Sequence, residues 1–485
     1  MRLLVLLFTL LVTSTSLKFL VFSTQFAKSH VNFLARLSDV LVDAGHEVVM
    51  VSPVMNSQVG EPMTKKARVI QIPQNQKVLP YEKFANEELS QNVWVSRSPL
   101  MFLVRMQAQA LPTIFMTGVI AHPELIDQLK NEKFDAAFSE SFDLCGPVIF
   151  HLIGVEKWAV TDSVAIKDGS FYFTQTPTNP AYVPSLMAGS TESMSFFGRL
   201  SNFFGATLSD IVSDVIFTKV EEILRKRVPD LPGIKELMAT NSLVFFNSEP
   251  LVDFPKITSA RTIDIGGITV SSGHKPLNET WSNILDLRPR TILLSFGTMA
   301  KAFNMPEEYK RTILETFKKF HDVTFIWKYE KPEHNISAGV PNLIESLWVP
   351  QRDMLHDPRL SAFITHCGQG STTESIDAGI PLIVIPVMAD QLRNAHQIER
   401  NGNGIRMAKT DLVNTGKLEN AIREILENDK YRQKARSLKQ MIADRPFSMK
   451  EIFVKNMEFL AKHGPLRQLD HYGRHLNFFQ YYLID

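Results

Sequence analysis

The sequence predicts an α/β protein made of two doubly wound, Rossmann-like domains that face each other across a cleft. Three observations favour this class. Short apolar strand patterns alternate with helical patterns in two separate series. The chain has 485 residues, 44% of them hydrophobic, which is enough to bury two large cores. A polar stretch at residues 271–289, with Gly273, Pro276 and Pro289, separates the two series as a linker.

The first series starts with an apolar strand at residues 18–23, then a helix at 31–44 that Gly45 ends, then a second strand at 46–52. A strand, a helix and a strand in this order form a βαβ unit, which implies a parallel sheet covered on both faces. Further strands are predicted at 136–139, 158–161 and 243–247. Residues 174–210, rich in Pro, Phe, Met and Ser, predict loops and short helices.

The second series predicts strands at 291–296, 324–328, 362–365 and 382–386, with helices between them such as 307–320. In sheets of this kind ligands bind at the carboxyl ends of the strands. A cleft between the two domains is therefore the expected site.

The N-terminus has the order of a cleavable secretory signal, residues 1–16. Arg2 precedes an apolar run, and small polar residues follow it. An uncleaved anchor or a buried first strand are the alternatives, but the run is shorter than the ~20 apolar residues that a spanning helix needs. No later stretch predicts a spanning helix. Entry into the secretory pathway would make the sequons at Asn278 and Asn335 glycosylation sites.

Charge and cysteine content exclude several classes of function. The chain has 52 Lys and Arg against 51 Asp and Glu, a net charge of +1, so no global basic field is present to bind nucleic acid. Its two cysteines, Cys145 and Cys367, form neither a disulfide framework nor a paired zinc motif. We expect no metal site and no nucleic acid partner.

The densest block of candidate site residues follows the predicted strand at 362–365. The turn contains Gly368 and Gly370, and a helix is predicted to start near Ser371. Backbone N–H groups and the helix dipole at such a turn can receive an anion, and His366 could add a donor. An ordinary strand-to-helix turn with a core-facing histidine fits this spacing equally well.

Residues that flank the turn favour a nucleotide-linked sugar as the ligand. Trp348 offers a planar face for a base, and Gln351 offers an amide for the edge of that base. Glu374, one turn into the predicted helix, could accept hydrogen bonds from ribose hydroxyls. Asp390 and Gln391 follow the next strand and add acceptors and a donor for a polyhydroxylated ring.

This set of residues resembles the signature of the UDP-glycosyltransferases, the superfamily that includes the UDP-glucuronosyltransferases. The shared pattern is Trp-x-x-Gln, His-x-Gly, Glu and Asp-Gln at these separations, and the resemblance covers most of the chain. It implies two Rossmann-like domains of the GT-B type. The implied parts are an N-terminal acceptor-binding domain at residues 17–270, the linker at 271–289, a C-terminal UDP-sugar-binding domain at 290–450 and a tail at 451–485.

The resemblance also implies a role for each matching residue. Trp348 would stack on uracil, Gln351 would contact the nucleoside and Glu374 would bind the ribose. Asp390 and Gln391 would hold the hydroxyls of the transferred sugar. The implied diphosphate site consists of one histidine and the small residues of two turns: Ser295, Gly297, Thr298, His366, Gly368, Gly370 and Ser371. Many members have an asparagine where this chain has Gly370, which removes one amide from the site.

The resemblance places the family's general base at His30, at the start of the first helix. A capping or solvated histidine is the alternative interpretation of this position. The matching position of the family's orienting acid, an aspartate in most members, is Glu140, with Asp143 as the alternative. Such an acid orients the base and stabilises its imidazolium form. His46 also matches a common pattern but begins a strand, so we expect it to be structural.

The implied reaction is an inverting displacement in which His30 takes the proton of an acceptor hydroxyl, with no cofactor beyond the UDP-sugar co-substrate. The donor is UDP-glucuronate or UDP-glucose. A non-catalytic UDP-sugar-binding protein and a UDP-sugar epimerase are the alternatives. The resemblance implies the lumen of the endoplasmic reticulum as the location and leaves membrane association open.

Soft, aromatic side chains in the first domain predict a pocket for small lipophilic alcohols, phenols or sterols, although a packed core fits them nearly as well. These residues are Phe171, Tyr172, Phe173, Tyr182, Met187, Met194, Phe196, Phe197, Phe203 and Phe204.

Overall fold

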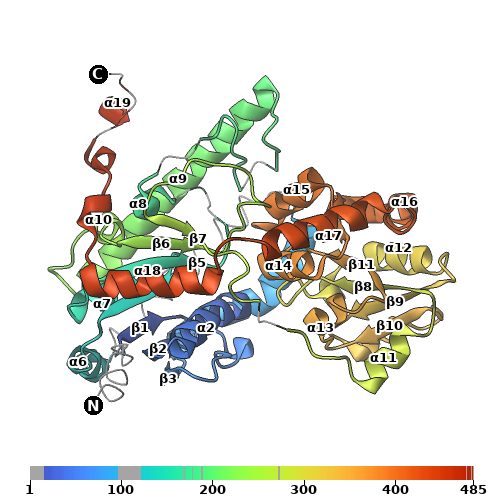
Figure 1. The fold of residues 1–485 in the computed structure, drawn as a ribbon, viewed down its shortest axis with the longest axis horizontal. Coiled ribbons are helices and arrows are strands. Elements are labelled where there is room, and N and C mark those ends of the chain that lie inside the picture. The colour runs from blue at the N-terminus through green and yellow to red at the C-terminus, as the bar shows by residue number, and fades with distance from the viewer. Residues whose placement is uncertain are drawn as a thin grey trace, which may run out of the picture.

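The computed structural model describes residues 16–485 except 97–121, 166, 167, 169, 177, 178, 187, 188, 271, 272, 477, 482 and 484. The predicted signal peptide, apart from Ser16, lies outside the described residues, as does Met187. Two parallel sheets lie side by side, and helices cover each of them (Figure 1). This arrangement is the predicted α/β class with two Rossmann-like sheets.

The first sheet has the strand order β3-β2-β1-β4-β5-β6-β7, and all of its pairings are parallel. Its strands are β1 (Lys18–Phe22), β2 (Glu47–Pro53), β3 (Arg68–Ile72), β4 (Ala136–Glu140), β5 (Trp158–Asp162), β6 (Leu243–Phe246) and β7 (Thr262–Asp264). The two edge strands, β3 and β7, were not predicted. Both are short and only partly buried, so they lack the apolar run that marks a central strand.

Alternate residues of β1 enter different cores, as expected for a sheet covered on both faces. Phe19 and Val21 pack with α2 (Lys28–Asp43) and α18 (Met449–His463), whereas Leu20 and Phe22 pack with α7 (Cys145–Leu152) and α10 (Ile234–Ala239). Most of helix α18 falls in the segment 451–485, which we expected to be a tail. Its buried Phe453 instead packs on the first sheet, so the chain returns to the first domain near its end.

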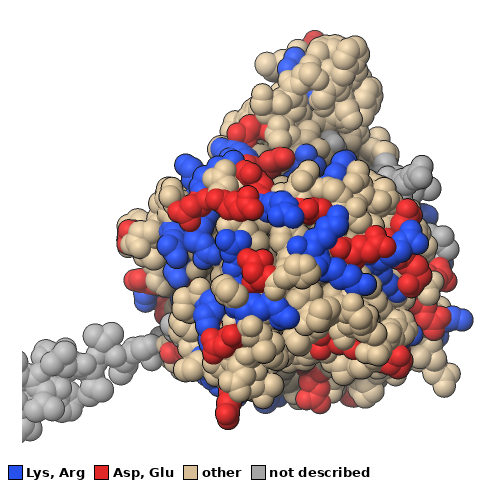
Figure 2. Space-filling view, turned by 90° about the vertical axis from the view of Figure 1, so that its right-hand side faces the viewer, with Lys and Arg blue, Asp and Glu red and all other residues tan. Residues whose placement is uncertain are grey.

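The second sheet has the strand order β10-β9-β8-β11-β12-β13, again with parallel pairings. Its strands are β8 (Arg290–Ser295), β9 (Val323–Lys328), β10 (Leu343–Ser346), β11 (Leu360–Thr365), β12 (Leu382–Val384) and β13 (Gly404–Arg406). One face is covered by α12 (Glu307–Phe317) and α16 (Thr415–Glu427). The other face is covered by α11 (Glu279–Leu285), α13 (Gln351–Leu355), α14 (Gln369–Ala378), α15 (Gln391–Asn401) and α17 (Lys430–Ala443). Lys, Arg, Asp and Glu side chains are intermixed on the surface of this domain (Figure 2).

Helix α9 (Phe196–Arg225) corrects the prediction of loops and short helices over 174–210. It has 30 residues, and its first turn is capped by Ser195, whose Oγ accepts from the Gly198 N–H at 3.2 Å. The buried face starts with Asn202 and Ala206, so the core-facing stripe is not apolar there and the helical period was hidden. One end of α9 stands away from the body (Figure 1). Among the described residues, no helix is long and apolar enough to cross a membrane.

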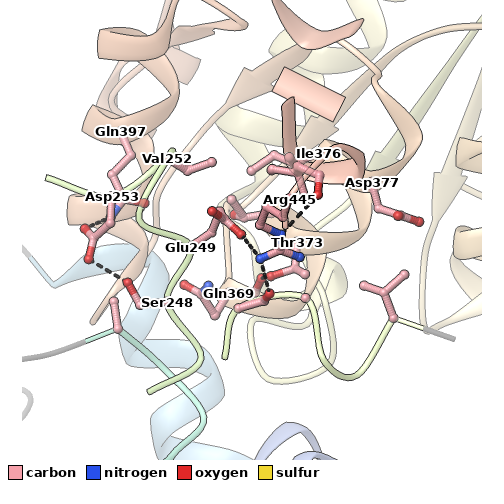
Figure 3. A pocket seen from close by; sticks show the side chains of 16 residues that line it. Ser248, Glu249, Val252, Asp253, Gln369, Thr373, Ile376, Asp377, Gln397 and Arg445 are labelled. Atoms are coloured by element: carbon pink, nitrogen blue, oxygen red, sulfur yellow. Dashed lines mark hydrogen bonds and ion pairs between the residues drawn. The ribbon is translucent and has the colours of Figure 1, made fainter. Parts of the chain in front are cut away.

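The two domains are held together by contacts outside the predicted cleft. In helix α4 (Ser90–Val95), the buried Trp94 packs in the core of the second domain, edge to face with Phe296, and its indole N–H donates to the Lys301 carbonyl at 3.0 Å. A cavity of about 70 Å³ lies between the segment after β6 and helix α14 (Figure 3). None of the predicted site residues lines it.

Charged pairs cross the domain boundary around this cavity. Glu249 pairs with Arg445, and Asp253 pairs with Arg393 and accepts from the Gln397 amide at 2.5 Å. Burial opposes ionisation of Asp253, but the charges of Arg393 and Lys256 outweigh it and lower the pKa of Asp253. These pairs connect the two domains, and we interpret this cavity as part of the domain interface.

Candidate active site

The carboxyl edge of the first sheet brings His30 and Glu140 together. Strands β1 and β4 are paired, so α2, which starts after β1, begins close to the end of β4. His30 lies in the first turn of α2, because this helix starts at Lys28 rather than at the predicted residue 31. Its Nδ1 is 2.7 Å from Oε1 of Glu140. The rings of Phe26 and Phe142 flank the imidazole, with centroids at 4.7 and 5.2 Å.

Glu140 is almost completely buried and is held by Ser163. The Ser163 N–H donates to Glu140 Oε1 at 3.0 Å, and Ser163 Oγ lies 2.8 Å from His30 Nδ1. Burial raises the pKa of a carboxyl group, but the charge of His30 and hydrogen bonds from His30 and Ser163 outweigh it and lower the pKa of Glu140. A buried, ionised carboxylate against the imidazole can stabilise the imidazolium form.

Asp143, the alternative partner of His30, is committed elsewhere. Its carboxylate accepts from the Thr24 hydroxyl and backbone and from the Cys145 N–H at 3.0 Å. Burial raises the pKa of Asp143 to about 6, although these hydrogen bonds oppose the shift. The geometry therefore joins His30 to Glu140 and not to Asp143. His46 bonds to the Leu17 N–H and lies 3.2 Å from Glu458, so its contacts are structural.

Two turns of the second domain pack against each other around His366. A Cβ added to Gly297 or to Gly368 would lie 2.7 or 2.6 Å from the His366 ring, so both positions require glycine. Gly297 also has a φ of 78°, which glycine adopts without strain. Ser295 Oγ accepts from the Gly297 N–H at 3.3 Å, and Thr365 Oγ1 lies 3.4 Å from His366 Nδ1. Burial and the nearby Lys328 lower the pKa of His366 to about 4.

Lys328 was missed by the sequence analysis. It ends strand β9, and its Nζ donates to the Gly297 carbonyl at 2.5 Å, inside the turn expected to hold the diphosphate. A single lysine at the end of an apolar strand does not by itself indicate a binding site. Its place follows from the pairing of β9 with β8, which brings the carboxyl ends of the two strands together.

The expected nucleoside residues lie around helices α13 and α14. Trp348 is 66% exposed just before α13, and its ring faces Lys28 of the first domain, with Nζ 5.9 Å from the ring centroid. The Gln351 amide donates to Glu374 Oε2 at 2.7 Å and to Ser371 Oγ at 3.3 Å. Burial raises the pKa of Glu374, while the hydrogen bond from Gln351 opposes the shift.

The expected sugar-binding residues stand at the start of α15. The Asp390 carboxylate accepts from Asn394 Nδ2 at 2.9 Å, and the same nitrogen donates to the Cys367 carbonyl at 3.0 Å. Burial raises the pKa of Asp390, and the hydrogen bond from Asn394 and the charge of His30 oppose the shift. Gln391 Oε1 accepts from the N–H groups of Val387 and Met388, which leaves its amide nitrogen as the group for a ligand.

The remaining predicted residues lie at the surface. Thr298 and Gly370 are exposed, and a Cβ at Gly370 would meet no atom within 4 Å. Asn278 and Asn335, the sequon residues, are exposed on the second domain. Asn278 caps α11 by accepting from the Trp281 N–H at 3.0 Å. Among the described residues, no cluster of three or more His, Cys, Asp or Glu is arranged to hold a metal ion.

The aromatic residues expected to form an acceptor pocket differ in burial. Phe173 is buried in the core of the first domain. Phe196, Phe197, Phe203 and Phe204 are 50 to 78% exposed on α9, so the described structure does not enclose them in a pocket. The side chains of Phe171 and Tyr172 lie outside the described residues. The amino-acid composition of this segment does not indicate whether its aromatic side chains point into the core or toward solvent.

The chain matches the family described as UDP-glucoronosyl and UDP-glucosyl transferase over residues 17–485. It is 33% identical to UDP-glucuronosyltransferase ugt-48 of Caenorhabditis elegans, over 97% of this chain and 91% of that one. It is 25% identical to rat UDP-glucuronosyltransferase 1A8, over 94% and 85% of the two chains.

Among solved structures, the chain is similar in fold to the glycotransferase of kitacinnamycin, with a TM-score of 0.63, 16% identity and coverage of 92% and 99%. It is also similar to the glycosyltransferase VinC in complex with DTDP, with a TM-score of 0.61, 15% identity and coverage of 92% and 100%. Two facing Rossmann-like domains and a match over nearly the whole chain lead to one conclusion: this chain is a GT-B glycosyltransferase that belongs to the UDP-glucuronosyl and UDP-glucosyl transferase family.

Proposed function

We propose that the protein transfers a hexose or hexuronic acid from a UDP-sugar to a hydroxyl of a small lipophilic acceptor, with inversion at the anomeric carbon. One observation carries this proposal. His30 is held by the buried Glu140 on the first domain, and Lys28 in the same helical turn faces the Trp348 ring of the second domain. This arrangement sets a base from one domain beside the expected donor site of the other.

His30 is the general base in this proposal. Because its Nδ1 faces Glu140, Nε2 takes the acceptor proton, and Glu140 stabilises the imidazolium that forms. The acceptor oxygen attacks the anomeric carbon while UDP leaves from the opposite face. General base catalysis contributes typically about 10²- to 10⁴-fold, and alignment of the reactants contributes much of the rest.

The negative charge that grows on the leaving diphosphate is met by three features of the second domain. These are the first-turn N–H groups of α14, the ammonium group of Lys328 and the imidazole of His366. A pKa of about 4 keeps His366 neutral at physiological pH. His366 therefore acts as a neutral hydrogen-bond donor, and Lys328 supplies the positive charge.

UDP-glucuronate is the first donor candidate, since the relatives ugt-48 and 1A8 are named UDP-glucuronosyltransferases, and UDP-glucose is the second.

The apolar signal pattern supports a location in the secretory pathway, in the lumen of the endoplasmic reticulum. Removal of N-glycans from protein made in animal cells should increase its mobility on a gel. Asn278→Gln with Asn335→Gln should abolish that change if these sequons are used.

The reaction is tested with purified protein, a panel of UDP-sugars and a phenol as acceptor. We expect UDP release that depends on the acceptor, and a loss of at least 100-fold in His30→Ala. His46→Ala, a histidine of the same domain with a similar glutamate neighbour, should retain activity. Equal rates for wild type and His30→Ala would refute the base assignment. UDP-sugar binding without release, or isomerised sugar without an acceptor, would refute the transferase proposal.

A further inference from the structure

Three neighbouring strands of the first sheet end in a row of polar residues. Strands β4, β5 and β6 pair in parallel, with Glu140 opposite Thr161 and Asp162 opposite Phe246. The residues at or just after the three strand ends are Glu140, Ser163 and Asn247. Since parallel strands end at one edge of a sheet, these residues are neighbours there, and two of them, Glu140 and Ser163, contact His30.

Asn247 holds Ser163 in place, and it is 5% exposed. Its backbone N–H donates to the Asp162 carbonyl at 2.9 Å, and its Nδ2 donates to the Ser163 carbonyl at 3.0 Å. Ser163 in turn contacts both members of the His30 and Glu140 pair. A shift of Asn247 would therefore move Ser163 and, through it, the proposed base His30.

Gln369 connects this row to the second domain. It is the first residue of α14, and its Nε2 donates to the Asn247 carbonyl at 2.8 Å across the domain boundary. Just before α14, the Cys367 carbonyl accepts at 3.0 Å from Asn394 Nδ2, which also donates to the Asp390 carboxylate at 2.9 Å. The start of α14 is thus bonded to the support of the base through the Gln369 side chain, and to the expected sugar-binding residue Asp390 through Asn394.

We infer that Gln369 is a positioning residue that sets the distance between the base His30 and the sugar held at Asp390. The inference rests on the proposed function. Each step is a hydrogen bond between buried or half-buried groups, from Gln369 through Asn247 and Ser163 to the base. A displacement of about 1 Å between reacting groups can cost up to about 100-fold in rate, so a contact that fixes this distance acts on turnover.

Two substitutions remove the amide donor and leave the main chain of Gln369 in place. Gln369→Met removes the donor with little change in volume. Gln369→Glu places a carboxylate oxygen against the Asn247 carbonyl and is expected to be the more severe change. Loss of one neutral hydrogen bond corresponds to about 2- to 10-fold. We expect kcat of Gln369→Met to fall at least about 2-fold, the lower end of this range, while KM for the UDP-sugar stays within about 2-fold of wild type.

Gln397→Met is the matched control, because Gln397 also donates an amide hydrogen bond across the domain boundary, to Asp253, but touches neither the base row nor Asp390. It should leave kcat unchanged. Thermal unfolding of each variant checks that a lower kcat does not come from loss of folded protein.

A double-mutant cycle with Ser163→Ala tests whether Gln369 acts through this row. If it does, the loss of kcat in the double variant is smaller than the product of the two single losses. Wild-type kcat in both Gln369 variants, or losses that multiply fully with Ser163→Ala, would overturn the inference. A cycle between Gln397→Met and Ser163→Ala with the same coupling would also overturn it. No UDP release by the wild type with any donor would instead overturn the proposed function.

Discussion

Replacing Glu140 with glutamine tests the electrostatic role of the buried acid. The two side chains have nearly the same shape, so Glu140→Gln keeps a carbonyl oxygen near His30 Nδ1 and removes the negative charge. In the wild type the two atoms are 2.7 Å apart, and Glu140 lies almost fully out of water. The variant therefore isolates the charge from the hydrogen bond.

The size of the effect follows from the distance. Two opposite unit charges with centres about 4 Å apart interact by about 4 kcal/mol at an effective dielectric constant of 20. The imidazolium of His30 is only partly formed when the acceptor oxygen attacks, so about 3 kcal/mol of this is lost in the transition state. We expect kcat to fall by about 100-fold. KM for the UDP-sugar should change little, because Glu140 does not belong to the expected donor site.

Steady-state UDP release at saturating donor and acceptor measures this change. Glu458→Gln is the control, since Glu458 forms a similar pair with His46 at 3.2 Å, away from the proposed base, and should leave kcat unchanged. Glu140→Asp keeps the charge with a shorter reach and should retain more activity than Glu140→Gln. A decrease of less than threefold in Glu140→Gln would refute the argument that a buried carboxylate supports the base.

Three further predictions concern the donor site. Trp348→Ala should weaken UDP binding by about 10-fold in calorimetry, because stacking of a base on an aromatic ring contributes about 1–3 kcal/mol; unchanged affinity would remove Trp348 from the site. Gly297→Ala would place a Cβ 2.7 Å from the His366 ring at a φ of 78°, so we expect UDP affinity to fall at least 10-fold, and a variant with normal affinity would contradict this. The pKa of His366 is about 4 in the folded chain and 6.5 in the unfolded chain. As pH falls from 6.5 to 4, His366 is therefore protonated in the unfolded chain but stays neutral in the folded chain. Stability should thus drop by up to about 3 kcal/mol from this residue, and chemical denaturation of His366→Gln should show a correspondingly weaker dependence on pH.

The central parts of the fold could be predicted because burial on both faces marks them in the sequence. Strands such as β1 and β8 are continuous apolar runs, and the helices between them have a clear period. Edge strands such as β3 have exposed residues and carry no such run. Helix α9 was missed since its outward face is aromatic and part of its inward face is small or polar.

Residue types at short separations along the chain were enough to predict the two-domain α/β class, the family and the residues that match its motif. The folded chain was needed to show that His30 pairs with Glu140 rather than with Asp143, that Ser163 contacts both members of this pair, and that Lys328 and Gln369 donate to the carbonyls of Gly297 and Asn247. Their places depend on which parallel strands are neighbours and on how the two domains meet. Those contacts join residues up to 133 positions apart, a separation at which no local pattern carries information.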